Sequence, residues 1–490
     1  MKDTDSFSNL SFRVLYKRLS ASVLTYGTGM ILATGAQFIL LPVFLRYLTP
    51  AEYGVWALTR VVAPFFASVL SLDLSGAIIR LYYEWKKEGR EKEALFSLWM
   101  FTLAWGGVMT ILLAWFGERL FSLIFTQLDF NPFIRLAILA EGINLTSLLV
   151  LKVLRIKDQA KSFAWLNLLQ VLSTMLLTIY FVAFLRQGVI GALYGVLIAN
   201  TVMLVIFSAV MMRNSRARLD VEALKEALRY SVPLVPGNIV NNVSNVLDRW
   251  FLDKVVPLQE IGLYSVARTI ANLLTAVFSA FQLAVMPFLV KVSIERDDHR
   301  EITGKIFFWL FSVLVLCAFT VSTFAPEALL ILGRDAYLES YIYVGPLAFA
   351  FMLGSFSFLP EFQITMSKET KYTSVIYGLK FLIFALLGSI LIVNYGIAGV
   401  LLTYVSTNGL ALVAHMRIGQ RLHPIDSRIL GWVAGAFLAV VLYSGTAYLL
   451  PVPNTIDVAT VVWKALVLLL LAGLISLTPR LRSRHVTVPS

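Results

Sequence analysis

The sequence predicts an all-α integral membrane protein with about 14 transmembrane helices, arranged as two pseudo-symmetric six-helix bundles followed by two C-terminal helices. Three observations predict this fold: the composition, the spacing of the apolar runs and an internal repeat. Of the 490 residues, 58% are hydrophobic and only 14% are charged, and the mean hydropathy is +0.79. Because a soluble domain carries about 25% charged residues, this chain belongs in a lipid bilayer.

The apolar runs set the number of predicted helices. A bilayer-spanning helix needs about 20 mostly apolar residues. Fourteen such runs occur, at 20–41, 55–79, 94–116, 132–154, 162–185, 189–212, 230–252, 263–289, 306–324, 341–366, 372–393, 397–416, 429–450 and 459–477. Short cytoplasmic loops collect Lys and Arg. With a cytoplasmic N-terminus, the cytoplasmic segments hold 30 of the 41 basic residues and the outer loops hold 5, so both termini are predicted to be cytoplasmic.

The spans divide into four predicted domains. Residues 1–212 form the first bundle, 213–229 a cytoplasmic amphipathic linker, 230–418 the second bundle, and 419–490 two accessory helices with a basic tail. The linker is predicted to be helical because its leucines recur on one face. The net charge of +12 is scattered over the loops, so it indicates orientation in the membrane rather than a nucleic-acid partner.

A nine-residue segment occurs twice, 208 residues apart. Residues 52–60 read Glu-Tyr-Gly-Val-Trp-Ala-Leu-Thr-Arg, and residues 260–268 read Glu-Ile-Gly-Leu-Tyr-Ser-Val-Ala-Arg. At the same offset Gln37 matches Asn245. We interpret the repeat as an ancient duplication, the alternative being two unrelated helix starts. Its Glu and Gly are interpreted as an outer turn that reverses the chain before helices two and eight.

Six basic residues remain within the predicted spans once those in the loops and at their edges are counted, and ionisable groups there are costly and usually face a bundle interior or a wet cavity. The Arg that ends each repeat, Arg60 or Arg268, lies about 8 Å into its helix. If both point into one cavity, their guanidinium groups can bind phosphate in a bidentate manner. The alternative is that they snorkel to the headgroups, as predicted for Lys464. The full set is Arg60, Arg135, Arg249, Arg268, Lys380 and Lys464.

Helix seven carries a polar stripe. Four amides follow i, i+3, i+4, i+7 spacing on one face, and such groups can bind sugar hydroxyls or link helices. With Gln37, the predicted glycan-facing set is Asn238, Asn241, Asn242 and Asn245. Proline bends a helix, so the preceding Pro233, Pro236 and Gly237 form a candidate hinge for alternating access.

Three acids are candidates for Na⁺ or proton coupling: Asp73, Glu141 and Glu361. Each could instead pair with a nearby Arg or Lys. Asp248 beside Arg249 is interpreted as a structural pair, and His415 as an ordinary position near a helix end. The sequence contains no Cys/His metal cluster, P-loop or nucleophile constellation, so we expect no catalytic residue, no metal site and no cofactor apart from a coupling ion.

These features together resemble polysaccharide flippases of the multidrug/oligosaccharidyl-lipid/polysaccharide exporter superfamily. The resemblance rests on the fourteen spans, the Glu-x-Gly-hydrophobic-aromatic segments after helices one and seven, and Leu-Asp-Leu-Ser-Gly at 72–76 followed by Arg80. It covers nearly the whole chain, and Ser75 stands where such proteins often have glycine. It implies that an undecaprenyl-pyrophosphate-linked oligosaccharide moves from the inner to the outer leaflet of a bacterial plasma membrane, for O-antigen, capsule or exopolysaccharide assembly. It also implies alternating access driven by an ion gradient.

In such flippases arginines in the cavity hold the pyrophosphate, and by position the resemblance assigns this role to Arg60, Arg249 and Arg268. A lipid II flippase shares the fourteen-span layout and is kept as an alternative function, whereas a drug/cation antiporter normally has twelve spans. A membrane glycan polymerase or ligase would be an enzyme with a large periplasmic loop, and no outer loop of this length occurs. The expected partners are lipid-linked oligosaccharide, membrane lipids and further polysaccharide-assembly proteins, with the chain acting as a monomer.

Overall fold

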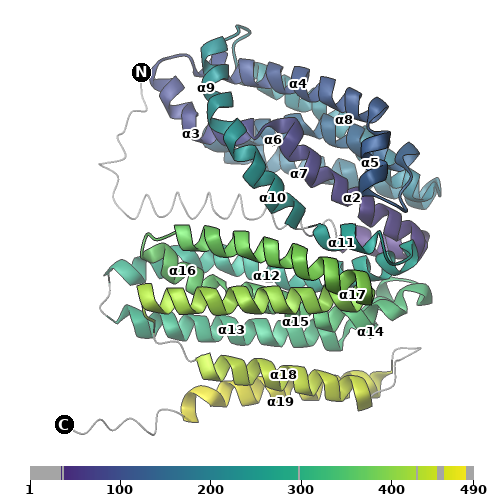
Figure 1. Cartoon of the computed structure of the whole chain (residues 1–490), viewed down its shortest axis with the longest axis vertical. Helices are drawn as coiled ribbons and strands as arrows, with labels where there is room; N and C mark the ends of the chain where they lie inside the picture. Colours follow the sequence, from purple (N-terminus) through teal and green to yellow (C-terminus); the bar gives the residue numbers. More distant parts are fainter. Residues whose placement is uncertain are drawn as a thin grey trace. The chain divides into compact units, whose positions relative to one another are not determined.

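The computed structural model describes residues 35, 38–244, 246–295, 298–425, 429–449 and 457–481, and every regular element in these ranges is helical. The described residues form two compact units (Figure 1). The first draws on Met1–Tyr47 and Leu58–Val246, and the second on Leu48–Ala57 and Leu247–Ser490. The helix α2 (Pro50–Ser71) therefore begins in the second unit and ends in the first. The predicted linker boundary at 213–229 stays a prediction.

The first unit is built from long antiparallel helices. Besides α2 and the short helix Phe38–Tyr47, its α-helices are α3 (Leu74–Lys87), α4 (Glu91–Phe116), α5 (Glu118–Ile124), α6 (Arg135–Ile156), α7 (Ala160–Ile179), α8 (Gly188–Asn214), α9 (Val221–Ser231) and α10 (Val235–Ser244). Short π or 3₁₀ turns extend some of them, at Phe130–Ile134, Tyr180–Phe184 and Val232–Leu234. The helices α6, α7 and α8 pack together, and α4 packs on α6.

The second unit repeats this arrangement and adds two helices. Its α-helices are α11 (Leu247–Leu252), α12 (Leu258–Glu295), α13 (His299–Thr323), α14 (Ala325–Leu332), α15 (Tyr341–Phe356), α16 (Phe358–Met366), α17 (Lys371–Leu422), α18 (Ile429–Leu449) and α19 (Val458–Leu481), with a 3₁₀ turn at Asp335–Ser340. The core pairs are α12 with α13 and α15, and α17 with α15 and α16. The additional helices α18 and α19 pack on α13.

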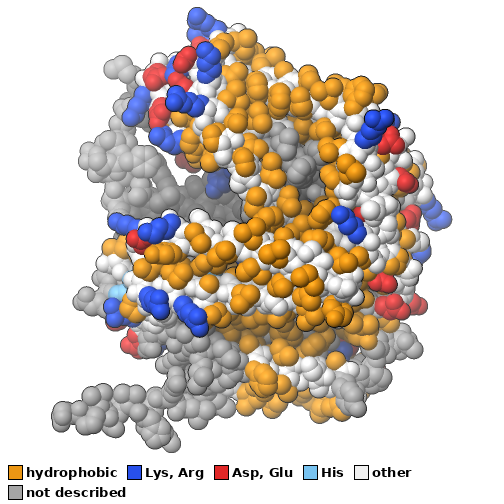
Figure 2. Space-filling model, viewed as in Figure 1, with side chains coloured by type: hydrophobic (Ala, Val, Ile, Leu, Met, Phe, Trp, Pro, Cys, Tyr) orange, Lys and Arg blue, Asp and Glu red, His pale blue; other side chains and the backbone are white. Residues whose placement is uncertain are grey.

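Nine helices in the described ranges are long and apolar enough to cross a membrane. They account for ten of the predicted spans, because 372–393 and 397–416 form the single element α17, bent at Gly396. Hydrophobic side chains cover most of the visible face in Figure 2, and Lys and Arg gather toward helix ends. The chain is therefore a multi-pass membrane protein. Most of the predicted span 20–41 lies outside the described residues, and the count of fourteen stays a prediction.

The predicted span 55–79 is not one helix. The helix α2 ends at Ser71 and α3 begins at Leu74, because Leu72 and Asp73 adopt left-handed φ angles of 46° and 52°. The Asp73 carbonyl accepts from the N–H of Gly76 at 2.9 Å. A Cβ at Gly76 would lie 2.7 Å from Asp73 Oδ2, which explains the glycine. The Leu-Asp-Leu-Ser-Gly motif thus forms the break between the two helices.

The predicted span 230–252 is also interrupted. It consists of the end of α9, a 3₁₀ turn at Val232–Leu234, α10 and α11. Pro233 lies in this turn, and a proline has no N–H with which to continue a helical hydrogen-bond ladder. Pro236 and Gly237 follow in the first turn of α10, and nothing lies within 4 Å of a Cβ built at Gly237. The candidate hinge therefore coincides with a real change of helix type, and its motion stays a prediction.

The interpretation of the repeated Glu as part of an outer turn is wrong. Glu52 lies in the first turn of α2, where its Oε2 accepts from the N–H of Thr49 at 2.7 Å. In return the N–H of Glu52 donates to Thr49 Oγ1 at 3.3 Å. This reciprocal pair is a capping box, which satisfies two backbone donors at a helix start.

The repeated glycines lie at a helix crossing, also within the second unit. A Cβ at Gly54 would lie 2.1 Å from the carbonyl oxygen of Leu258, and a Cβ at Gly262 would lie 1.9 Å from that of Pro50. The glycine of each copy thus packs against a backbone carbonyl beside the other copy, and the contact is reciprocal. The helices α2 and α12 can approach this closely only because neither position carries a side chain.

The structure extends the repeat beyond nine residues. Gly188 and Gly396, again 208 residues apart, both have positive φ, 59° and 55°, and both lie at the start of a long helical segment. Asp158 and Lys368 have positive φ, 55° and 61°, in matching turns before α7 and α17. The side-chain amides of Asn200 and Asn408, 208 residues apart, each donate at 2.9 Å to a carbonyl on a neighbouring helix. Duplication explains these coincidences, because they involve backbone geometry as well as residue type.

Candidate substrate and ion sites

The first unit contains a polar network that joins α2, α6 and α7. Glu141 on α6 accepts a hydrogen bond from Asn144 and interacts electrostatically with Arg60 on α2. Asn144 Oδ1 accepts from Gln170 Nε2 at 2.8 Å and from Ser147 Oγ at 2.6 Å. Glu141 was predicted to couple ions and Arg60 to bind phosphate, and the structure places them within range of each other. Sequence reasoning missed Gln170 and Ser147, which no spacing pattern distinguishes from helix-linking polar residues.

The second unit contains a denser network around a fully buried carboxylate. Asp248 is 0% exposed, and its Oδ2 accepts from Arg268 Nη1 and from the Tyr264 hydroxyl. Arg268 also donates to the Tyr404 hydroxyl at 3.1 Å. Arg249 lies farther away, with its Nε 3.9 Å from Asp248 Oδ1. The pair interpreted from sequence, Asp248 with Arg249, is therefore present, but Arg268 is the nearer partner.

The two repeated arginines have acidic neighbours from non-equivalent positions. Arg60 faces Glu141, and Arg268 faces Asp248. Asp248 is a fully buried charge and therefore needs a partner, whereas the Arg60 side chain is exposed. In each unit the acid and the arginine come from different helices. A guanidinium group carries five N–H donors, which is the basis for predicting that both arginines contact an anionic ligand. Their assignment to pyrophosphate stays a prediction.

A third cluster joins α16 and both halves of α17. Glu361 Oε1 accepts from the Tyr377 hydroxyl and lies 3.9 Å from His415 Nε2. The rings of Tyr377 and His415 are 5.6 Å apart and edge-on. Lys380 Nζ lies 5.9 Å from the centre of the Tyr377 ring. His415, interpreted from sequence as an ordinary position near a helix end, is fully buried and faces the carboxylate, and its role stays a prediction.

The remaining predicted site residues are scattered. Asn238 and Asn242 are half-buried on α10, and Asn241 lies on the same helix. Gln37 and Asn245 lie outside the described residues. Asp73 caps α3 in a left-handed conformation. In the described parts of the chain, no group of three His, Cys, Asp or Glu side chains is placed to hold a metal ion.

Lys464 corrects another expectation. It was predicted to snorkel, yet its Nζ lies 2.6 Å from Glu327 Oε1, and the side chains are only 6% and 7% exposed. The ion pair links α19 to α14. A lysine can be buried in this way because its counter-charge is buried with it.

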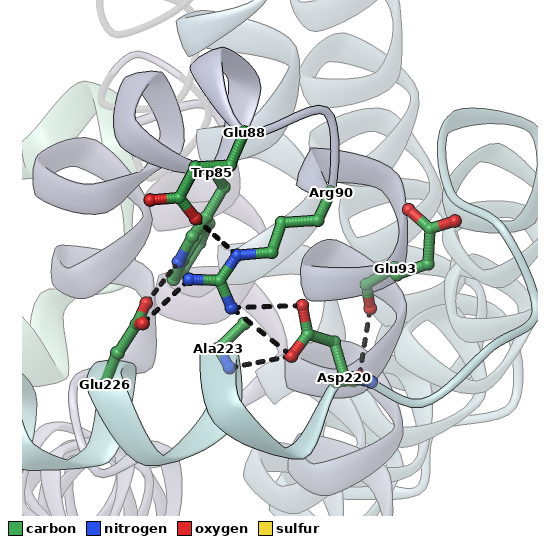
Figure 3. A network of polar contacts seen from close by, with 8 residues as sticks. Trp85, Glu88, Arg90, Glu93, Asp220, Ala223 and Glu226 are labelled. Carbon is green, nitrogen blue, oxygen red and sulfur yellow. Dashed lines mark hydrogen bonds and ion pairs between the residues drawn. The ribbon is translucent and has the colours of Figure 1, made fainter.

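A polar network outside the membrane-spanning helices holds α9 against the turn between α3 and α4 (Figure 3). Arg90 contacts Glu226 at 2.7 Å, Glu88 at 2.5 Å and Asp220 at 3.3 Å. Trp85 Nε1 donates to the second oxygen of Glu226 at 2.7 Å. Hydrogen bonds to Glu226 and then to Glu88 raise the pKa of Arg90. Burial tends to raise the pKa of Glu226, but the hydrogen bonds from Trp85 and Arg90 outweigh it and lower that pKa below its ordinary value.

Comparison with known proteins places this fold among membrane transporters. Residues 43–342 match the model of a family described as polysaccharide biosynthesis protein. Among curated proteins, no sequence matches the chain. A solved lipid II flippase, MurJ, in an inward closed conformation superposes with a TM-score of 0.71 at 14% identity, covering 94% of this chain and 98% of that one.

Two further solved structures share the fold. An inward-facing multidrug resistance MATE family transporter of the MOP superfamily has a TM-score of 0.61 at 16% identity, over 79% of this chain and 94% of that one. A MOP superfamily transporter from Pyrococcus furiosus has a TM-score of 0.56 at 16% identity, over 82% and 95%. At these identities the likeness shows the fold alone.

Proposed function

Because the chain belongs to the polysaccharide biosynthesis protein family, we propose that it flips an undecaprenyl-pyrophosphate-linked oligosaccharide from the inner to the outer leaflet of a bacterial plasma membrane. The observation that carries the proposal is the pair of repeated arginines, Arg60 and Arg268, set within helices of a lipid-transporter fold. A lipid pyrophosphate is the anion that must cross the bilayer, and guanidinium groups bind phosphate through charge-assisted hydrogen bonds. Arg249 is the third proposed ligand. O-antigen, capsule or exopolysaccharide assembly would use the product.

The other predicted residues have supporting roles in this proposal. The amides on α10, Asn238, Asn241 and Asn242, would contact sugar hydroxyls, and the junction at Pro233 would accommodate alternating access. Glu141 beside Arg60 offers a group that responds to ion and ligand binding. The chain would act as a monomer with cytoplasmic termini, among membrane lipids and other assembly proteins.

A lipid II flippase is the second candidate. It is favoured by the likeness to MurJ, which extends over 98% of that chain. Lipid II also carries a pyrophosphate on a polyprenyl lipid, so the arginines suit both substrates and only the sugar differs. The family membership favours a polysaccharide precursor, and a direct comparison of the two lipids decides between them.

The test measures leaflet translocation in proteoliposomes that contain fluorescent lipid-linked oligosaccharide or fluorescent lipid II. We expect the wild type to flip the oligosaccharide faster than lipid II. We expect Arg60→Ala and Arg268→Ala to abolish flipping, and Arg60→Lys to restore part of it, since lysine binds phosphate only as a point charge. Arg119→Ala is the matched control, because Arg119 is exposed after α4.

The controls separate the possible failures. Each variant must be purified in the folded state, as judged by its thermal unfolding. A folded wild type that flips neither lipid rules out the flippase. Wild-type rates in both alanine variants would mean that the arginines do not bind the substrate.

A further inference from the structure

The cluster of Glu361, Tyr377, Lys380 and His415 lies inside the second unit, near one end of its helices. Glu361 precedes the end of α16 at Met366 by five residues, and His415 precedes the end of α17 by seven. At 1.5 Å per residue, both lie about 8–10 Å from the helix ends. Ionisable groups at such a depth are costly and usually have a function. Neither the family match nor the polar networks around the repeated arginines explain why this cluster is present.

The imidazole of His415 is the unusual member. It is 0% exposed, and the Ala411 backbone, one turn earlier on the same helix, is within hydrogen-bonding range of its ring. Its Nε2 faces Glu361 Oε1 at 3.9 Å, and a proton on that nitrogen would turn the contact into an ion pair.

The surrounding groups define what the cluster can bind. Tyr377 and Lys380 face it from the first half of α17, Glu361 from α16 and His415 from the second half of α17. On the side of α13 the neighbour is Phe307, which packs on Phe358 and Phe362 of α16 and carries no charge.

The charge balance of the cluster favours a proton over a metal cation. With neutral imidazole, the carboxylate and the ammonium cancel. The positive charge of Lys380 repels Na⁺. Glu361 already accepts a hydrogen bond from the Tyr377 hydroxyl, so it is a poorer ligand for Na⁺, which needs several free oxygen ligands. A proton needs only one ring nitrogen.

We propose that His415 and Glu361 form the proton-binding site that couples transport to the proton gradient, with Tyr377 orienting the carboxylate and Lys380 excluding Na⁺. This inference rests on the proposed transport function. The proton moves from water to His415 Nε2, and the resulting imidazolium is stabilised by the Glu361 carboxylate. On release the proton returns to water, and neither side chain is otherwise changed.

The first experiment needs no transport. Infrared difference spectroscopy of the purified protein between alkaline and acidic buffer records protonation of imidazole and carboxyl groups. Because the chain has four histidines, we expect His415→Gln to lose one imidazolium contribution from the wild-type signal, and Glu361→Gln to shift that contribution. The control His423→Gln should keep it, because His423 stacks on His299 at 5.2 Å outside the cluster. The same signal in His415→Gln as in the wild type would overturn the proposal.

The second experiment imposes a pH gradient or a Na⁺ gradient on proteoliposomes. We expect the pH gradient to accelerate flipping by the wild type and by Glu369→Gln, an exposed carboxylate near the start of α17. The variants His415→Gln and Glu361→Gln should flip lipid at the rate measured without a gradient, whichever gradient is applied. Acceleration by Na⁺ alone, or an intact pH response in His415→Gln, would contradict the site. A wild type that never flips lipid would instead defeat the proposed function and leave the infrared result standing.

Discussion

At the scale of single residues, the structure shows how charges are kept inside an apolar fold. Lys464 and Glu327 are both nearly inaccessible and form one ion pair between α19 and α14. Desolvating two charges is costly, and their attraction offsets that cost only while both are present. The pair therefore specifies where α19 docks more than it adds to stability.

Breaking this pair should be far worse than removing it. We expect Lys464→Met or Glu327→Gln alone to destabilise the second unit by about 3–5 kcal/mol, and the double variant Lys464→Met/Glu327→Leu to recover most of that loss. Thermal unfolding of the detergent-purified protein measures both. The exposed pair Lys305–Glu301 is the matched control, and breaking it should cost about 1 kcal/mol or less. Equal effects at the two pairs would disprove the buried role.

The candidate site could be predicted only in part. Arg60 and Arg268 stand out because the repeat places them at equal positions. Their acidic neighbours could not be identified, because Glu141 and Asp248 come from non-equivalent helices and no spacing relates them to the arginines. His415 was dismissed for the same reason, since its carboxylate lies 54 positions earlier in the chain.

At the scale of elements, α9 shows how a short amphipathic helix is fixed to a bundle. Asp220 accepts from the N–H of Ala223 at 2.9 Å and so caps the helix. Ala223 and Ala227 are fully buried against a core that contains Trp85. The network of Arg90 then closes the outer side of the contact (Figure 3). Small buried residues and a polar clamp together hold α9 on the first unit.

This clamp should weaken in acid. The pKa of Glu226 is lower in the folded protein than its ordinary value, so its contribution is complete above that value and is lost as the pH falls through the lowered pKa. We expect α9 to lose hydrogen-exchange protection as the pH falls below the ordinary range of a glutamate carboxyl, after correction for intrinsic exchange, and Glu226→Gln to lose it already at neutral pH. Glu222→Gln, an exposed acid on the same helix, should behave as the wild type. Protection that is independent of Glu226 would show that burial of the alanines suffices.

The helix boundaries were predictable where backbone chemistry enforces them. The break at Gly396 falls between two predicted spans, because a glycine readily adopts the positive φ found there. The break at Leu72 and Asp73 was missed, since leucine rarely adopts a left-handed conformation, aspartate does so only in some contexts, and the apolar run continues through them. The interruption at Pro233 was predicted as a bend, whereas the structure changes helix type.

At the scale of the whole molecule, duplication organises the chain. The repeated glycines, turns and amides lie at matching places in the two halves, whereas the polar networks around the arginines draw on non-equivalent positions. The fold class followed from composition and periodicity because the bilayer admits few architectures. The crossing of α2 and α12 did not, because contacts between carbonyls and glycines leave no trace in hydropathy.

Both glycines of the crossing should be equally intolerant of substitution. We expect Gly54→Ala and Gly262→Ala each to lower stability by about 1–3 kcal/mol, because the new methyl group would overlap a carbonyl oxygen of the other copy. Gly409→Ala is the control, since nothing lies within 4 Å of its Cβ and alanine favours a helix by about 1 kcal/mol. Thermal unfolding of the three variants decides, and an unchanged transition in Gly54→Ala or Gly262→Ala would mean that the helices separate freely.

Gene duplication ordinarily creates redundancy, since one copy can decay while the other continues to work. The crossing of α2 and α12 reverses that relation, because each glycine accommodates a carbonyl that belongs to the other copy. A substitution in either half therefore disturbs the crossing itself, and the other half cannot compensate for it. The two repeats therefore depend on each other at this crossing. We expect positions 54 and 262 to be constrained together for as long as the two helices remain in contact.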